Sequence, residues 1–187
     1  MIENFLRRPH RTAEIIADIV RVAGALSVVI AAIWWTGTDA GILALALPAL
    51  LVPRFIGVRP SFDIAYGVAV LVAAWSNVLD LYRSVVGWDL VVHTVSTGLI
   101  AAMAYLALVR WDMMPRPPAA RRAAVIVTTS LGLAASALWE ILEWIGKTFI
   151  TDEIFVTYTD TIGDMAVGGL GSLVAGVLVA RVRLLRE

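Results

Sequence analysis

Long apolar runs separated by short polar segments dominate the amino-acid sequence. A helix crosses a lipid bilayer with roughly 17–25 consecutive, mainly apolar residues. Six runs of this length are predicted, at about residues 16–35, 40–57, 62–80, 89–109, 122–145 and 160–180. The second run contains Pro48 and Pro53, so we expect a kinked or short helix there. The pattern predicts an all-α integral membrane protein, a bundle of six transmembrane helices that forms a single domain over residues 1–187.

The composition agrees with this pattern and narrows the chemistry. Hydrophobic residues make up 60% of the chain and charged residues only 16%, whereas about a quarter of the residues of soluble domains are charged. The chain has no cysteine, which excludes disulfides, thiolate nucleophiles and Cys-ligated metals. Its formal net charge is zero. The lipid bilayer is the partner that we expect, and nothing in the charge pattern indicates nucleic-acid binding.

Arginine and lysine residues are distributed unevenly between the two sides of the predicted bundle. With six spans, both termini share one side with the loops that follow the second and fourth helices. That side holds twelve arginines: Arg7, Arg8, Arg11, Arg54, Arg59, Arg110, Arg116, Arg121, Arg122, Arg181, Arg183 and Arg186. The opposite side holds only Arg83 and Lys147. Because basic residues favour the cytoplasmic side of a membrane protein, both termini are predicted to be cytoplasmic.

Three predicted helices carry pairs of acidic or imidazole side chains at their extracytoplasmic ends. Each pair is spaced by three or four residues, so its two side chains share one helix face. The pairs are Asp89 with His93, Glu140 with Glu143, and Asp160 with Asp164. They predict one cluster of five carboxylates and one imidazole at a single membrane depth. Asp80, at the end of the third predicted helix, is a further candidate member.

Such a cluster needs compensating positive charge, because neighbouring carboxylates repel one another. Protons, a basic side chain or a metal cation would supply it, and Arg83 and Lys147 are the only basic candidates on this side. A divalent ion fits best, because carboxylates and imidazoles on facing helices form the metal sites of helical bundles. This donor set indicates Zn, Mn, Fe, Mg or Ca, bound singly or as a pair. The predicted metal ligands are Asp89, His93, Glu140, Glu143, Asp160 and Asp164.

Some acidic residues have a simpler explanation. A charged side chain near a helix end can extend into the lipid headgroup region, and an aspartate at a helix start favours the helix dipole. Asp80, Asp89 and Asp160 lie at predicted helix boundaries where this explanation applies. On the opposite side of the membrane, Asp18 and Arg21 are expected to form a structural ion pair or an interfacial anchor. Asp63 near the start of the third helix is expected to cap or anchor it.

The last predicted helix carries small residues at four-residue intervals. They are Gly168, Ser172 and Gly176. Small residues at this spacing let two helices approach closely in lipid, where apolar burial alone does not drive association. We therefore expect this helix to press tightly against a neighbour.

Three stretches read together resemble the DUF2238 group of bacterial inner-membrane proteins. They are WDLVVHTVSTG, LWEILEWIG and YTDTIGDMAVGGLGSLVAG. The pattern of the group is Asp-x-x-x-His followed by Gly, then Glu-x-x-Glu, then Asp-x-x-x-Asp before a Gly-rich helix. The resemblance covers about residues 80–180. It implies a multi-pass protein of the bacterial cytoplasmic membrane and supplies no reaction. In such a membrane the orientation predicted from the basic residues would turn the cluster toward the periplasm.

Three functions are compatible with this cluster. The first is a metal-dependent enzyme acting on a lipid or lipid-linked substrate, with Glu140 and Glu143 as catalytic residues and Glu143 as the general base. The second is a cation or proton transporter, which the scarcity of polar residues in the inner half of the helices disfavours. The third is a structural or assembly protein in which the metal ion stabilises the fold.

Overall fold

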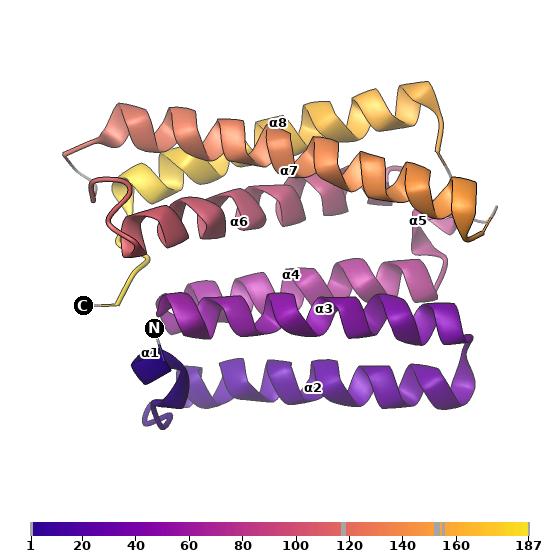
Figure 1. The fold of residues 1–187 in the computed structure, drawn as a ribbon, viewed down its shortest axis with the longest axis horizontal. Coiled ribbons are helices and arrows are strands. Elements are labelled where there is room, and N and C mark those ends of the chain that lie inside the picture. Colours follow the sequence, from indigo (N-terminus) through magenta and orange to yellow (C-terminus); the bar gives the residue numbers. More distant parts are fainter. Residues whose placement is uncertain (1, 117–118, 152–153, 155, 187) are drawn as a thin grey trace. The chain divides into compact units, whose positions relative to one another are not determined.

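The computed structural model describes residues 2–116, 119–151, 154 and 156–186, and these residues form eight helices (Figure 1). The helices are α1 (Ile2–Leu6), α2 (Thr12–Trp34), α3 (Gly37–Ile56), α4 (Pro60–Val78), α5 (Leu81–Ser84), α6 (Trp88–Arg110), α7 (Arg121–Phe149) and α8 (Tyr158–Arg181). Six of them, all except the short α1 and α5, are long and apolar enough to cross a membrane. The predicted all-α fold with six membrane-spanning helices is therefore confirmed, with each helix end within about four residues of its predicted position.

The chain forms two compact units. The first comprises Met1–Trp88 together with Arg183–Glu187, and the second comprises Asp89–Val182. The first unit contains α1 to α5, and the second contains α7, α8 and nearly all of α6. That both units act as one domain stays a prediction.

Helix α3 continues through both of its prolines. It begins with a capping box in which Thr36 and Asp39 satisfy each other's backbone N–H groups. It ends 20 residues later at Gly57, whose positive φ of 74° lets its N–H reach the carbonyl oxygen of Pro53 at 3.0 Å. The expectation of a short helix is therefore wrong. Proline is tolerated in a membrane-spanning helix because neighbouring helices and local adjustments satisfy the backbone groups that it frees.

The first unit has an apolar core and holds both ends of the chain. Helices α2, α3 and α4 lie side by side around buried residues such as Leu43 (Figure 1). The segment after α8 returns to this unit, where Leu185 forms an antiparallel bridge with Val58. The backbone N–H of Arg59 donates to the carbonyl of Leu184 at 2.7 Å. Both termini therefore lie at one end of the unit, as an even number of spans requires, while their cytoplasmic orientation stays a prediction.

The second unit is packed through small residues. A Cβ atom added at Gly98 on α6 would lie 2.8 Å from the backbone oxygen of Gly171 on α8. A Cβ atom added at Gly176 on α8 would lie 3.0 Å from the Cα atom of Val125 on α7. Glycine is required at these positions because the obstacle is backbone, which cannot rotate away. The predicted tight packing of the last helix is therefore confirmed.

The buried face of α7 is polar and its exposed face is apolar. From Ala124 to Glu140 its buried residues recur every four positions: Ala124, Thr128, Gly132, Ser136 and Glu140. Large apolar side chains such as Leu138 and Leu142 are exposed instead. This arrangement is the reverse of a soluble amphipathic helix and suits a helix whose outer face contacts lipid. It places a carboxylate inside the unit, near the end at which the predicted cluster lies.

Candidate metal centre

Helix α6 supplies two adjacent side chains near its start. Asp89 lies in the first turn, and His93 follows one turn later on the same face. The Nε2 atom of His93 lies 3.3 Å from Oδ1 of Asp89. His93 is only 8% exposed, whereas Asp89 is half-buried. The four-residue spacing therefore points an imidazole and a carboxylate at one place, as the sequence predicts.

Helix α8 supplies a second carboxylate to the same place. Thr157 caps the helix by accepting a hydrogen bond from the N–H of Asp160 at 3.3 Å. This cap puts Asp160 in the first turn and Asp164 in the second. Asp164 is 2% exposed, and its Oδ1 atom accepts no hydrogen bond from the described residues. An ionised carboxylate in this position lacks the donors that normally offset its burial.

Asp89, His93 and Asp164 form a group that could hold a metal ion. One ligand atom of each lies within 4.8 Å of the ligand atoms of the other two. Metal–ligand bonds of about 2.0–2.2 Å separate neighbouring ligand atoms by roughly 3–3.6 Å. The distance of 3.3 Å between the His93 and Asp89 atoms falls within this range. Two carboxylates and one imidazole form a donor set that Zn, Mn and Fe accept.

Glu140 on α7 is a buried carboxylate beside this group. It is 5% exposed, and neither of its oxygen atoms accepts a hydrogen bond from the described residues. Thr161 lies beside it, without suitable hydrogen-bond geometry. Glu140 also lies close enough to His93 to interact with it electrostatically. Burial of an unpaired carboxylate is costly, so Glu140 needs a proton or a cation nearby.

Glu143, one turn further along α7, occupies a more accessible position. It is half-buried, and its Oε1 atom accepts a hydrogen bond of 2.9 Å from the indole N–H of Trp139. It interacts electrostatically with Glu140, His93 and Asp89. Because its other oxygen accepts no hydrogen bond from the described residues and Trp139 is exposed, this carboxylate lies at the edge of the group.

The six predicted ligands therefore fall into two sets. Asp89, His93 and Asp164 each offer one ligand atom within 4.8 Å of those of the other two. Glu140, Glu143 and Asp160 lie outside this group and interact with it electrostatically. The three helices thus bring all six side chains into one neighbourhood, and three of them are close enough together to share one ion.

The other charged residues considered with the cluster have partners elsewhere. Asp80 is exposed, lies outside the helices with a φ of 54°, and pairs with Arg83 at 2.6 Å. Lys147 donates to the carbonyl oxygen of Ile154 at 2.9 Å. Among the described residues, neither basic side chain forms an ion pair with the five carboxylates of the cluster.

Two buried hydroxyl groups beside the cluster escape the sequence prediction. Ser136 donates a hydrogen bond of 3.4 Å to the backbone oxygen of Asp164. A Cβ atom added at Gly168 would lie 2.8 Å from the hydroxyl of Ser136 and 3.2 Å from that of Thr97, so both hydroxyls flank this glycine. The position of Ser136 could have been predicted from the sequence, because Thr128, Ser136 and Glu140 are spaced by multiples of four residues and so share one face of α7.

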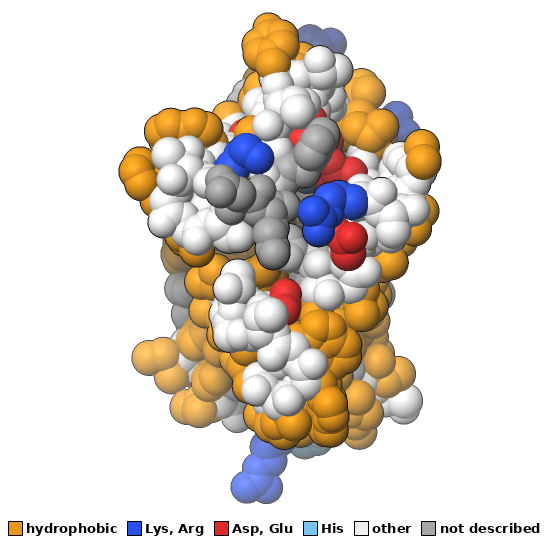
Figure 2. Space-filling view, turned by 90° about the vertical axis from the view of Figure 1, so that its right-hand side faces the viewer, with side chains coloured by type: hydrophobic (Ala, Val, Ile, Leu, Met, Phe, Trp, Pro, Cys, Tyr) orange, Lys and Arg blue, Asp and Glu red, His pale blue; other side chains and the backbone are white. Residues whose placement is uncertain are grey.

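Figure 2 looks onto the end at which α7 ends and α8 begins. Acidic and basic side chains are visible there among polar atoms, and hydrophobic side chains extend outward around them. This distribution is typical of helix ends that emerge from a lipid bilayer.

Comparison with known families gives one match. The family model described as "Predicted membrane protein (DUF2238)" matches residues 13–184, which is most of the chain. Comparisons with curated proteins and with solved structures give no significant match.

Proposed function

The chain belongs to the DUF2238 family of predicted membrane proteins, and we propose that it is a metal-dependent enzyme with one divalent ion held by Asp89, His93 and Asp164. The observation that carries this proposal is that one ligand atom of each residue lies within 4.8 Å of the ligand atoms of the other two. The unpaired, buried oxygens of Asp164 and Glu140 support it independently, because acidic side chains seldom stay buried without a donor or a cation.

The charge of the cluster favours a metal ion over a basic partner. Five carboxylates lie around one imidazole, and the two basic residues predicted on this side, Arg83 and Lys147, have other partners. A divalent ion would offset two negative charges at once and would also satisfy the oxygens that accept no hydrogen bond. Glu140 is placed to stabilise such an ion electrostatically or to become a fourth ligand.

Three protein ligands favour a catalytic role over a structural one. Structural metal sites are usually closed by four protein ligands, whereas catalytic sites keep a position open. A bound divalent ion would polarise a phosphoryl or acyl group and would promote deprotonation of water. Glu143 is the best-placed general base, because it is partly accessible and interacts with His93 and Glu140.

The surroundings of Glu143 favour an amphipathic substrate. Trp139 donates its hydrogen bond to Glu143 while its ring is exposed, and Leu142 beside it is exposed as well. A carboxylate next to lipid-facing apolar side chains suits a lipid or lipid-linked substrate whose polar group lies at the membrane boundary. We infer that this activity lies on the periplasmic side of the bacterial inner membrane, an orientation that the excess of arginine at the opposite ends of the helices supports.

Elemental analysis of the detergent-purified protein tests the metal site. The protein is purified without chelator, or stripped and reloaded with Zn²⁺ or Mn²⁺, beside His93→Ala and Asp164→Asn variants. Asp112→Asn is a matched control, since Asp112 is exposed with a φ of 57° that asparagine also tolerates. We expect about one ion per chain in the wild type and in the control, and loss of the ion in both cluster variants. Metal contents that do not differ between the wild type and the cluster variants would refute the site.

A second function, proton or cation transport, gains support from the buried hydroxyl groups. Thr128 is fully buried on the same face of α7 as Ser136 and Glu140, and its hydroxyl has no partner among the described residues. Polar side chains therefore extend from the cluster toward the opposite end of α7. Ion flux into vesicles containing the protein, abolished by Thr128→Val without loss of the bound metal, would favour transport over an enzyme.

A further inference from the structure

A pocket rich in arginine lies at one end of the first unit, where α2 begins, α3 ends and α4 begins. It is a small depression that is partly open to solvent. Five arginines and three carboxylates line it, so positive charge is in excess by two. The arginines are Arg7, Arg8, Arg21, Arg54 and Arg186. Its lining residues belong to the first unit, whereas the proposed metal ligands belong to the second.

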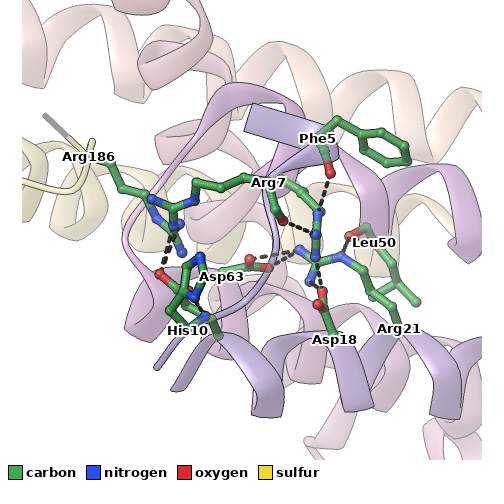
Figure 3. A network of polar contacts seen from close by, with 10 residues as sticks. Phe5, Arg7, His10, Asp18, Arg21, Leu50, Asp63 and Arg186 are labelled. Carbon is green, nitrogen blue, oxygen red and sulfur yellow. Dashed lines mark hydrogen bonds and ion pairs between the residues drawn. The ribbon is translucent and has the colours of Figure 1, made fainter. Parts of the chain in front are cut away.

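The deeper arginines of the pocket are fully engaged with the protein (Figure 3). Arg21 donates to Asp63 at 2.5 and 2.7 Å, to Asp18 at 3.0 Å and to the Leu50 carbonyl at 3.0 Å. Arg54 pairs with Asp18 and also donates to two backbone carbonyls of the N-terminal segment. These two guanidinium groups therefore hold the helices together and have few donors left for a ligand.

The three arginines at the mouth of the pocket have donors to spare. Arg7 and Arg186 share a single carboxylate oxygen of Glu14, at 2.7 and 3.2 Å (Figure 3). The other oxygen of Glu14 accepts the backbone N–H of His10 at 2.8 Å. Arg8 is exposed and has no hydrogen bond or ion pair with any described residue. One carboxylate therefore pairs with two guanidinium groups while a third lines the same pocket unpaired, which leaves donors for an additional anion.

The position of the mouth indicates the source of that anion. Helices α2, α3 and α4 are candidate membrane spans, so their common end lies at the membrane boundary. The short helix α1 is held against α3 by the stacked rings of Phe5 and Phe55, whose centroids are 4.4 Å apart. Its apolar side chains Ile2 and Leu6 are nevertheless 70% exposed, a feature of segments that dip into the headgroup layer.

We propose that this pocket binds the phosphate group of an anionic membrane lipid. Guanidinium groups recognise phosphate oxygens through pairs of charge-assisted hydrogen bonds, and basic pockets between helices bind anionic headgroups. Arg8 supplies an unengaged guanidinium group, and Arg7 and Arg186 supply their remaining N–H donors. The acyl chains of the lipid would lie along the exposed apolar side chains of α1, Ile2 and Leu6.

Thermal unfolding of the full chain in a maltoside detergent tests this proposal. Its seven tryptophans report unfolding while phosphatidylglycerol, phosphatidylcholine or inorganic phosphate is added. We expect phosphatidylglycerol alone to raise the unfolding midpoint of the wild type. Arg8→Ala should fold with an unchanged midpoint in the absence of lipid and should weaken the apparent affinity about tenfold, the size of one charge-assisted hydrogen bond.

Arg11→Ala is the matched control, because Arg11 precedes α2 on the same segment but does not line the pocket. It removes the same charge and should leave the lipid response unchanged. Equal weakening by Arg8→Ala and Arg11→Ala would overturn the pocket in favour of general charge attraction. Equal stabilisation by inorganic phosphate, or by phosphatidylcholine, would overturn the anionic lipid as the ligand.

Discussion

Arg21 on α2 donates two hydrogen bonds to the carboxylate of Asp63 on α4, which lies 42 residues further along the chain. Both side chains are almost buried, with 11% and 9% of their surfaces exposed. The predicted pair of Arg21 with Asp18 is confirmed at 3.0 Å. Of the two roles expected for Asp63, capping is wrong, because α4 begins after Arg59 with no side-chain cap. The carboxylate instead anchors α4 through its hydrogen bonds with Arg21. The ion pair thus joins α2 to α4.

Removal of Arg21 should therefore destabilise the first unit. Arg21→Met keeps most of the side-chain volume but leaves Asp63 buried without its partner, which costs about 3–5 kcal/mol in comparable cases. Unfolding by detergent titration measures the loss. A double variant, Arg21→Met with Asp63→Leu, should recover most of it, because no charge then stays buried and unpaired.

The exposed pair of Asp80 and Arg83 provides the comparison. Their side chains are more than half exposed, so Arg83→Ala should cost less than about 1 kcal/mol. An Arg21→Met variant that loses no more stability than Arg83→Ala would show that the Arg21–Asp63 pair does not tie the helices together.

Close approach of α6 and α8 predicts an unusual sensitivity at Gly171. A Cβ atom added there would overlap the backbone carbonyl of Thr94, and the helices must separate to admit it. Gly171→Ala should therefore destabilise the protein by about 1–3 kcal/mol, despite the higher helix propensity of alanine. Gly163→Ala on the same helix should be neutral or stabilising, because its Cβ atom would approach no closer than 3.8 Å to Leu90. Similar unfolding midpoints for the two variants would contradict this packing.

The sequence predicts the helices well because lipid imposes one simple rule. A spanning helix must be long and apolar, and this requirement can be recognised from the composition of each segment alone, without knowing which helices it contacts. The bounds of α6 and α8 accordingly differ from prediction by one or two residues. The expectation of a short α3 fails because Pro48 and Pro53 disrupt a helix less within a membrane than in a soluble protein.

The cluster is predictable only as far as each helix carries its own signal. The spacing of Asp89 and His93 places both on one face of α6, and the structure shows them 3.3 Å apart. Which residue of another helix completes the group depends on the rotation of that helix, which glycine contacts set. Gly171 and Gly98 allow α8 to approach α6 so closely that Asp164, and not Asp160, reaches His93 and Asp89. No residue spacing within one helix contains that information.

Replacement of the buried carboxylate of Glu140 should stabilise the metal-free protein and reduce the stability that the protein gains from metal. Without metal, Glu140→Gln should raise the unfolding midpoint, because it removes a charge that accepts no hydrogen bond from the described residues. With Mn²⁺ or Zn²⁺ added, the wild type should gain more stability than the variant. Thermal unfolding with a chelator and with each ion measures both effects. A variant that is less stable than the wild type in the chelator would show that Glu140 has a structural role of its own.

Distances within the cluster predict a ranking of metal affinities. His93→Gln and Asp164→Asn remove members of the group whose ligand atoms lie within 4.8 Å of one another, so each should weaken binding by about 100-fold or more. Asp160→Asn should weaken it by less than about tenfold, because Asp160 contributes through its charge and not as a ligand. Competition with a chromophoric chelator for Zn²⁺ or Mn²⁺ gives the affinities, and Asp112→Asn reports the effect of removing a distant charge. If Asp160→Asn proves as damaging as Asp164→Asn, the ion lies closer to the start of α8 than the three-residue group places it, and Asp160 is a ligand.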